Sequence, residues 1–520
     1  MKRKMRRRRE RTKEKKLQER SQKQLQDKVG DRKVSADLEE NIRFISQVLG
    51  DGADLITRKF TIQYAPDRQA ALLYLDGMSN VPLLDNFVLR PMMLQGEQVK
   101  NKTELWDLIF ESLLHTGETK KQTEMRSMVE SLLSGDAILF VDGCTEGAVI
   151  GAKGWQQRGV TDPKSESVIR GSREGFTENL RVNTALIRRR LKDPDLRMKN
   201  YKIGVRTNTN VSVMYIEGVV DDAVVKEVED RLKSIELDGI LESGYIEEMI
   251  EDTHWTPFPG IQNTERPDAA VANLLEGKIC ILVDGTPNVL IAPAVFSQFY
   301  ASPEDYYERY LIATFLRGLR LVAFLTALLL PALYIAFISF HPEMIPSKLA
   351  IAMAAGRASV PFPSIVEALV MEISVEILRE ASVRLPGPIG PTIGIVGALV
   401  IGEAAVSAGL VSPLMVIVVG MTTISSYANP SYNAAISVRL LRFPFMIVAA
   451  AFGLYGIMMS LMILLVHLIQ LRSFGVPYMS PLAPLRISDV KDTLIRVPWP
   501  WMKKRPVTFR PGDDRREGET

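Results

Sequence analysis

Two long stretches without a charged residue constrain the fold of this chain more than any other feature. Leu321–Phe340 holds twenty such residues and Phe443–Val466 holds twenty-four. About 20 apolar residues in a helix cross a hydrocarbon core of roughly 30 Å. A purely soluble chain is therefore excluded, although 46% hydrophobic and 24% charged residues would suit an ordinary soluble protein.

Charge is distributed unevenly along the 520 residues. Residues 1–33 carry 16 Lys/Arg and 5 Asp/Glu, whereas residues 34–300 carry 29 and 41. Residues 1–33 have too few apolar side chains to bury a core and contain no apolar signal-peptide region, so we expect a basic disordered arm. The arm is either a solvated tail that helps to orient the protein or a segment that adheres to anionic lipid. It has no aromatic residues to support RNA binding, so no nucleic acid partner is expected.

The half before the first apolar stretch contains an internal duplication. Leu132–Gly143 matches Leu274–Gly285 at an offset of 142, and Leu73–Met78 matches Met214–Val219 at an offset of 141. Each copy reads as strand, acidic-Gly turn, helix and a second strand ending in Val-Asp-Gly. We predict an α/β cytoplasmic domain with two duplicated subdomains, at residues 34–150 and 201–300, joined by a linker helix region at 151–200.

The chemistry-bearing residues of this half favour structural roles. Asp142 and Asp284 each precede a glycine, and Asp before Gly is far more often a turn former than a catalyst. Cys280 lies in an apolar strand and is most simply a small buried hydrophobe. The two cysteines and four histidines exclude a disulfide scaffold and a Cys/His zinc site, and no nucleotide or hydrolase motif occurs. We therefore expect no enzyme activity, no metal and no cofactor.

The linker region is rich in arginine. A helix opening near Thr177 and Glu178 would place apolar positions at Leu180, Leu186, Ile187 and Leu191. The arginines either form salt bridges with the acidic domain on a solvated helix or make a contact surface between subunits. The subunit-contact candidates are Arg170, Arg173, Arg188, Arg189 and Arg190.

Residues 301–470 are predicted to form an α-helical multi-span membrane domain, followed by a basic tail at 471–520. The expected spans are 321–340, 391–409, 413–427 and 443–468, with the middle two forming a helical hairpin. Arg309, Arg317 and Arg320 precede the first span, so the positive-inside rule places both termini in the cytoplasm. Arg439 and Arg442 would then lie on the opposite side, against that rule.

Segment 364–385 has an amphipathic pattern. Glu372, Glu376, Arg379 and Glu380 fall within one helical sector, with Ile377 and Leu378 among the apolar residues opposite. Such a helix is too charged to face lipid, so it lies on the interface or faces water or protein. Glu372 and Glu376 are therefore candidates for lining a pore or gating it.

The next apolar stretch combines small residues with one acid. Small residues that let another backbone approach closely recur every fourth position, at Gly390, Gly394, Ala398 and Gly402. Glu403 lies beside this face, and an acid this deep in an apolar segment is a functional candidate by default. The alternative is a protonated or hydrogen-bonded helix contact.

Several motifs resemble one known family. Ile169–Asn179, followed by Leu186–Leu191, looks like the signature of the A subunits of bacterial spore germinant receptors. The membrane half adds Glu380–Pro391 and Gly397–Val406, and Tyr427–Pro430 and Arg496–Trp501 are similar to the family too. The resemblance covers about residues 35–506.

This resemblance implies an integral, multi-pass protein of the spore inner membrane that is needed for nutrient-triggered germination. It implies a complex with a transporter-like B subunit and a lipoprotein C subunit, in which a homo-oligomer of A subunits in the membrane lipid forms a ligand-gated ion channel. A non-conducting scaffold that transmits a signal is the first alternative. An A-like paralogue from the dipicolinate-release operon is the second.

Overall fold

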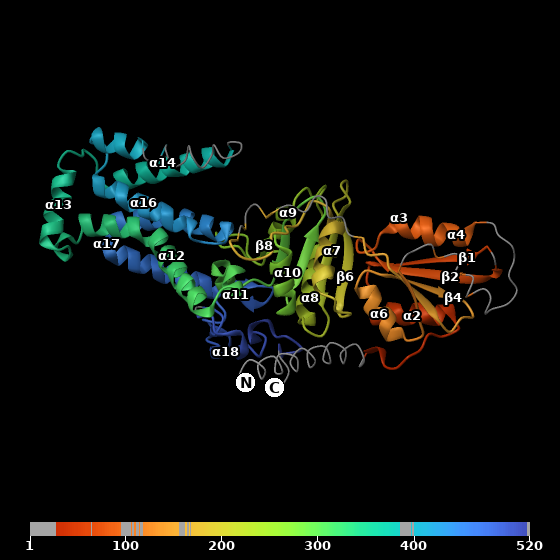
Figure 1. Cartoon of the computed structure of the whole chain (residues 1–520). Coiled ribbons are helices and arrows are strands. Elements are labelled where there is room, and N and C mark those ends of the chain that lie inside the picture. The colour runs from red at the N-terminus through yellow and green to blue at the C-terminus, as the bar shows by residue number, and fades with distance from the viewer. Residues whose placement is uncertain are drawn as a thin grey trace, which may run out of the picture.

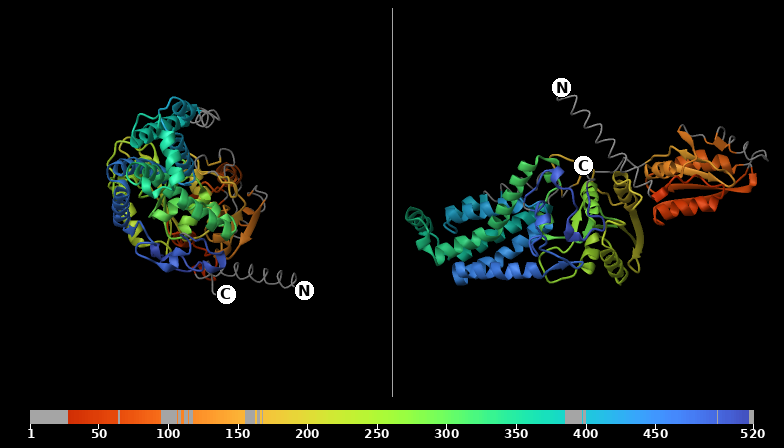
Figure 2. Two further views of the ribbon diagram at one scale, coloured as in Figure 1. Left: turned by 90° about the vertical axis from the view of Figure 1, so that its left-hand side faces the viewer. Right: turned by 90° about the horizontal axis from the view of Figure 1, so that it is seen from below.

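The computed structural model describes residues 28–516 apart from 64, 95–105, 107–108, 111–113, 115–117, 155–161, 164–165, 167, 385–396, 398–399 and 494. The described chain is elongated, with two sheet-containing units followed by a helical half (Figure 1). The helices of that half extend away from the sheets as roughly antiparallel arms (Figure 2).

The first unit is a sheet of five antiparallel strands in the order β1-β2-β4-β5-β3. Helices α2 (Leu38–Val48) and α6 (Met125–Leu133) cover one face, and α3 (Val81–Leu84), η1 (Asp85–Leu89) and α4 (Arg90–Met93) cover the other. Alternate residues of β2 and β4 point into the two cores, as the two-residue period of a strand requires. The strands are β1 (Leu55–Ile62), β2 (Ala65–Leu75), β3 (Thr119–Gln122), β4 (Ala137–Val141) and β5 (Gly147–Ile150).

The second unit repeats this topology with the order β6-β7-β9-β10-β8. Helices α8 (Asp222–Lys233) and α9 (Ser243–Ile250) pack on one face, and α7 (Leu180–Arg190) and α10 (Pro267–Leu275) on the other. Because the two strand orders are the same, the predicted fold class with two duplicated α/β subdomains is confirmed. The strands are β6 (Leu196–Ile203), β7 (Thr209–Ile216), β8 (Gln262–Thr264), β9 (Ile279–Val283) and β10 (Val289–Ala292).

The two Asp-Gly motifs form turns, as predicted. Gly143 has φ 80° and Gly285 has φ 91°, conformations that favour glycine. Asp284 also accepts a hydrogen bond from the backbone N–H of Leu180 at 3.2 Å, which fixes the start of α7 on the sheet. Cys280 is fully buried in β9, as predicted.

Among the described residues of the second half, two helices are long and apolar enough to cross a membrane, judged by length and composition. They are α12 (Tyr310–Ser339) and α17 (Tyr432–Gln470), and α16 (Pro413–Tyr427) is a shorter apolar helix. The predicted first span, 321–340, falls within α12 and its C-terminal cap. The remaining helices before and between them are α11 (Glu304–Tyr307), α13 (Ser347–Arg357), α14 (Ser364–Arg384) and a helix that includes residues 401–407.

The prediction of one straight span over 443–468 is wrong, because α17 reverses direction at Gly453. This residue has φ 59° and ψ −142°, outside the helical region. A Cβ on Gly456 would lie 2.6 Å from the carbonyl oxygen of Val448, an approach that a continuous helix excludes at that separation. Ala434 and Leu468, near the two ends of α17, pack in one cluster with Phe258. The uncharged stretch 443–466 therefore contains the turn of a helical hairpin, whose two helical arms together form α17.

Helices α14 and α16 run in the direction opposite to α12. Ser339 at the end of α12 contacts Ser364 at the start of α14, with 2.8 Å between the hydroxyl oxygens. Tyr334 near the end of α12 similarly contacts Ser412, the N-cap of α16, at 3.0 Å. Helices α14 and α16 therefore both run back toward the sheets, whereas α12 runs away from them.

The C-terminal tail returns to the second sheet. It contains β11 (Arg472–Ser473), β12 (Val476–Pro477), α18 (Ile487–Val490), and the short turns η5 (Trp499–Trp501) and η6 (Val507–Phe509). The N–H of Gly512 donates to the carbonyl oxygen of Val219 at 3.1 Å, and Arg505 Nε donates to that of Leu275 at 2.7 Å. The tail therefore connects the end of the helical half to the second subdomain.

Candidate functional site: charge pairs within the helical half and their link to the sheets

A buried ion pair joins α14 to α17. The Arg442 guanidinium donates to the Glu372 carboxylate through Nη1, and both side chains are almost completely inaccessible. Arg442 Nε also donates to the carbonyl oxygen of Ala327 in α12 at 2.9 Å. Arg442 of α17 therefore contacts both α14 and α12.

A second group of charges lies one turn closer to the sheets. Glu376 accepts from Arg379 at 2.8 Å and from Arg439 of α17 at 3.2 Å. The predicted placement of Arg439 and Arg442 on the side away from the sheets is wrong, because both lie on the first arm of α17, which begins beside the sheets. They serve as partners for the acids of α14.

Glu372 and Glu376 on the charged side of α14 face protein, one of the alternatives left open by its amphipathic pattern, whereas Glu380 on the same side is exposed. Glu367 is fully buried, accepting from Arg357 at 3.1 Å and from the backbone N–H of Ser412 at 2.9 Å. Ile377, on the opposite side, is 64% exposed. In its first turns α14 therefore has exposed apolar residues on one side and buried acids at Glu367 and Glu372, which suits a helix that contacts lipid on its outer surface.

The Glu372–Arg442 pair has unused hydrogen-bonding capacity. Glu372 Oε1 and Arg442 Nη2 are buried and have no hydrogen-bond partner among the described residues. Removing one member of a buried pair costs about 3–5 kcal/mol, because the other charge is left uncompensated.

Glu403 differs from the other acids because it lies on the outside of the bundle. Its side chain is exposed, next to the exposed apolar residues Val400 and Ile401, and no ion pair to it is found within the described part of the chain. The neighbouring Gly402 is buried, and a Cβ there would lie 3.2 Å from Val416 of α16. Gly402 therefore lies close to α16, and the small-residue packing face as a whole stays a prediction. The other three small-residue candidates, Gly390, Gly394 and Ala398, lie outside the described residues.

The arginine candidates of the linker separate into two groups. Arg188 is buried and bonds Asp54 of the first subdomain, with 2.9 Å from Nε to Oδ2, so a subunit-contact role for Arg188 is wrong. Arg189 and Arg190 pair with Glu174 of the same chain. Arg170 and Arg173 are exposed and stay predictions as subunit contacts. Helix α7 begins at Leu180 with Asn179 as its N-cap, slightly later than predicted.

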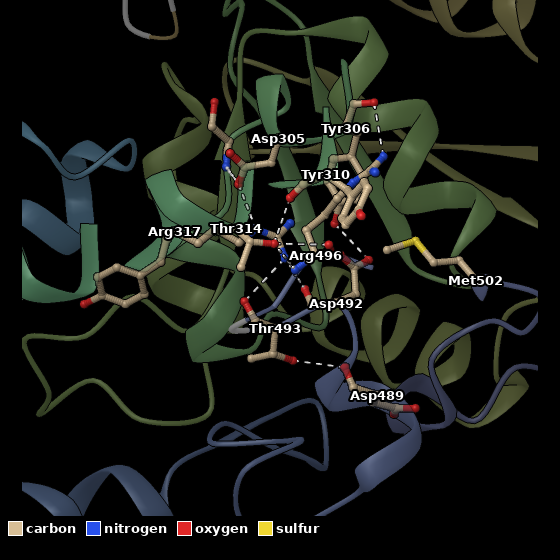
Figure 3. A network of polar contacts seen from close by, with 12 residues as sticks. Asp305, Tyr306, Tyr310, Thr314, Arg317, Asp489, Asp492, Thr493, Arg496 and Met502 are labelled. Carbon is tan, nitrogen blue, oxygen red and sulfur yellow. Dashed lines mark hydrogen bonds and ion pairs between the residues drawn. The ribbon is translucent and has the colours of Figure 1, made fainter. Parts of the chain in front are cut away.

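A polar network fastens the start of α12 to the sheets and to the tail (Figure 3). Arg317 Nε donates to Asp305 at 2.9 Å, and Arg317 Nη1 donates to the carbonyl oxygen of Asp492 at 2.7 Å. Asp305 is fully buried and also accepts from Arg320 at 2.8 Å, and the Tyr306 hydroxyl donates to Asp492 at 3.0 Å. Three chain segments, α11, α12 and the tail, therefore meet at one arginine.

Burial has the largest effect on the pKa values of Asp492 and Tyr306 in this network. It raises the pKa of Asp492, and the positive charge of Arg317 opposes that shift. Burial and the nearby Asp492 carboxylate also raise the pKa of Tyr306 well above its usual value. Tyr306 therefore stays a neutral donor at physiological pH.

A cavity of about 400 Å³ adjoins the network between α10, α11 and the tail. Tyr307 on its wall donates to Asp268 at 2.6 Å, and Arg516 pairs with Glu276. Its charged walls are thus already paired. Among the described residues, no group of three or more His, Cys, Asp or Glu side chains is arranged to hold a metal.

Sequence reasoning missed the arginine partners and the network at Arg317. One signal was available for the pairs: Glu372 and Glu376 are one turn apart, and so are Arg439 and Arg442. Two matching turns of opposite charge in apolar surroundings indicate helices that pack against each other. No local pattern relates Arg317 to Asp492.

A duplicated α/β domain joined to a helical half with membrane-capable helices and internal charge pairs defines a membrane-associated protein. Residues 43–508 match the family described as Bacillus/Clostridium GerA spore germination protein. The chain belongs to this family, and it is a GerA-type spore germination protein.

Two relatives that are more than 40% identical agree with this assignment. Spore germination protein KA of Bacillus subtilis is 46% identical over 95% of this chain and 90% of its own length. The uncharacterized membrane protein YfkQ of the same organism is 44% identical over 93% of each chain. The solved N-terminal domain of the A subunit of the Bacillus megaterium spore germinant receptor GerK3 is 37% identical. The match covers 51% of this chain and 98% of that domain, with a TM-score of 0.41.

Proposed function

We propose that this chain is the A subunit of a nutrient receptor in the spore inner membrane and that several copies assemble around an ion-conducting path. The family membership supports the receptor role. The exposed Glu403 carboxylate on an apolar helix surface supports the path, because a charge facing lipid costs about 2.5–3.5 kcal/mol on insertion scales. A neighbouring copy or a water-filled lumen would remove that cost.

The proposed topology has six helical arms across the membrane. They are α12, α14, the predicted span 391–409, of which the structure describes a helix at residues 401–407, α16 and the two arms of α17. An even number leaves the sheets and the tail on one side, in agreement with the contact between Arg317 and Asp492. Arg309, Arg317, Arg320 and Arg472 flank the first and last arms, and by the positive-inside rule this side is the cytoplasm.

Repetition of Glu403 around a symmetry axis would give a ring of carboxylates. Rings of acidic side chains line many cation pathways. Glu372 and Glu376 contribute in a different way, because their charges are balanced by Arg442 and Arg439 within the subunit. We propose that these pairs hold the arms in register around the path.

The non-conducting scaffold is the competing function, and the same pairing favours it. Acids that are neutralised within one subunit attract no permeant cation. In that case the helical half transmits a conformational change from its partners, and Glu403 contacts a neighbouring protein. The partners in both cases are the transporter-like B subunit and the lipoprotein C subunit that the family resemblance implies.

Flux through the reconstituted receptor separates the two functions. The A, B and C subunits are placed in liposomes, and nutrient-triggered cation efflux is compared between the wild type and Glu403→Gln. Glu380→Gln is the matched control, because Glu380 is an exposed acid of α14 paired with Arg384. A conducting path predicts slower or less selective efflux for Glu403→Gln alone. Unchanged efflux in Glu403→Gln, with assembly intact, would support the scaffold.

A further inference from the structure

We propose that residues 481–493 and 495–504, here called the interface tail, lie on the bilayer surface and bind the headgroups of anionic phospholipids. This inference rests on the membrane insertion proposed above. It concerns a part of the chain that the ion path does not use.

The position of the interface tail relative to the bilayer follows from its contacts with α12. The Thr314 hydroxyl donates to the carbonyl oxygen of Arg496 at 3.2 Å, and the Arg496 N–H donates back to the same hydroxyl at 3.2 Å. Arg317, bound to Asp492, precedes the uncharged stretch at Leu321 by one turn, or about 6 Å. The tail therefore lies just outside the hydrocarbon, at the level of the headgroups.

The outer surface of the interface tail is unusually apolar for a segment that lies against a soluble domain. Ile487 is 74% exposed and Trp501 is 70% exposed. Tryptophan is enriched at membrane–water interfaces, where its ring lies among the headgroups. The other large exposed apolar residues of the segment are Leu482, Leu485, Ile495 and Trp499.

This surface adjoins an apolar stripe on α12. Leu311, Phe315, Leu319 and Val322 are all exposed, and their spacing of four, four and three residues places them on one side of the helix. Trp499 lies beside the start of this helix, with its ring 5.9 Å from that of Tyr306. The stripe continues into the uncharged stretch, so the tail extends the surface that faces lipid.

Charges in the interface tail are segregated between its two sides. The acids point inward: Asp489 accepts from the N–H and hydroxyl of Thr508 at 2.9 and 2.8 Å, and Asp492 accepts from Arg317. Lys491 and Lys503 are exposed, and neither has an ion pair among the described residues. The outer side is therefore basic and apolar, which matches an anionic lipid surface. Lysines near such a surface are attracted to its negative charge.

A second exposed tryptophan lies at the same end of the helical half. Trp255 is 95% exposed, and its neighbour Thr256 bonds His467 near the end of α17, with 2.9 Å between Oγ1 and Nε2. The backbone carbonyl of Pro257 accepts from Ser437 on the first arm of α17. Aromatic residues thus occur at this level beside α17 as well as beside α12.

Quenching of tryptophan fluorescence in nanodiscs tests the proposal on the full chain. Discs contain phosphatidylcholine alone or an equal mixture with phosphatidylglycerol, each with a headgroup spin label as quencher. The signal of Trp499 and Trp501 is the difference between the wild type and the Trp499→Phe/Trp501→Phe variant. We expect more than half of this difference to be quenched in the mixed discs, and less in phosphatidylcholine alone.

The lysines are tested with a matched control. Lys491→Gln/Lys503→Gln should reduce quenching in the mixed discs to the level in phosphatidylcholine, whereas Lys226→Gln on α8 should leave it unchanged. A difference signal that is not quenched would overturn the proposal. So would equal quenching in both lipids, or loss of quenching when the B and C subunits are added, because a protein would then cover the surface. Co-elution of the chain with the discs reports membrane insertion separately, so a failure of insertion is distinguished from a failure of lipid binding.

Discussion

Arg317 of α12 and Asp492 of the tail form an ion pair, with 3.2 Å between Nη1 and Oδ1, although 175 residues separate them in the chain. The same guanidinium bonds the fully buried Asp305, at the junction with the second subdomain. The first membrane-capable helix is therefore fixed to both the sheets and the C-terminal tail. Arg317 is therefore one of the contacts that a movement of the sheets relative to the helical half would alter.

Arg317→Gln should destabilise the junction by about 3 kcal/mol, because it leaves the buried Asp492 without a charged partner. Asp305 keeps Arg320, so the loss stays at the lower end of the range for buried pairs. The measurement is thermal unfolding of the full chain in detergent. Arg510→Gln, an exposed arginine of the tail, is the control and should change little. Equal melting of Arg317→Gln and the wild type would show that the network does not stabilise the junction.

The Glu372–Arg442 pair predicts strong coupling between two substitutions. Glu372→Leu and Arg442→Met should each destabilise the chain by several kcal/mol, about 3–5, because each leaves one buried charge unpaired. The double variant should recover most of the loss. A double-mutant cycle on the unfolding free energy measures this coupling. Additive losses would mean that the two side chains do not interact.

The hairpin at Gly453 predicts that a side chain is not tolerated there. In Gly453→Ala the new Cβ would lie 2.9 Å from Phe340 Cβ, and the backbone would keep a φ of 59° that favours glycine. We expect a loss of about 1–3 kcal/mol, measured by thermal unfolding in detergent. Gly420→Ala is the control, because a Cβ there meets nothing within 4 Å and alanine favours a helix. A straight helix through Gly453 would instead be stabilised by alanine.

Glu247 predicts a pH dependence in the second subdomain. Burial, together with the Glu251 and Glu242 carboxylates, raises its pKa from 4.5 to about 7. Between these values the folded state keeps a proton that the unfolded state has lost, so stability falls as the pH rises from 4.5 to 7. Glu247→Gln should therefore stabilise the chain above pH 7, by at most about 3 kcal/mol, and much less at pH 4.5. Thermal unfolding at both pH values checks this, with the exposed Glu248→Gln as control; a gain of equal size at both pH values would contradict it.

The soluble fold could be predicted from the sequence because its signals are local and occur twice. The offsets of 141 and 142 mark two copies, and each Asp-Gly turn follows an apolar strand. A strand and its tight turn depend on a few neighbouring residues, so the pattern carries over directly to the structure. The identical strand orders of the two sheets follow from that repetition.

The helical half was harder to predict, because a hydropathy pattern does not show where the chain reverses direction. Residues 443–466 have no charge and read as one span, yet one glycine reverses the chain within them. The partners of Glu372 and Glu376 on α17 are 70 and 63 residues away, beyond any helical period. The candidate acids were correctly located on one side of a helix, but the sequence did not reveal that arginines neutralise them. Glu403 stays a prediction, and its exposed position is compatible with the role proposed for it.

Chemical modification of a cysteine at position 403 tests the ion path most directly. The native Cys144 and Cys280 are buried, so a Glu403→Cys variant offers one accessible thiol in the described part of the chain. The reconstituted receptor is treated with a cationic methanethiosulfonate reagent, and mass spectrometry confirms the modification. Phe315→Cys on the exposed stripe of α12 is the control. An ion path at Glu403 predicts that modification there reduces nutrient-triggered cation flux by more than half, with no effect at position 315. Full modification of Glu403→Cys with unchanged flux would contradict it.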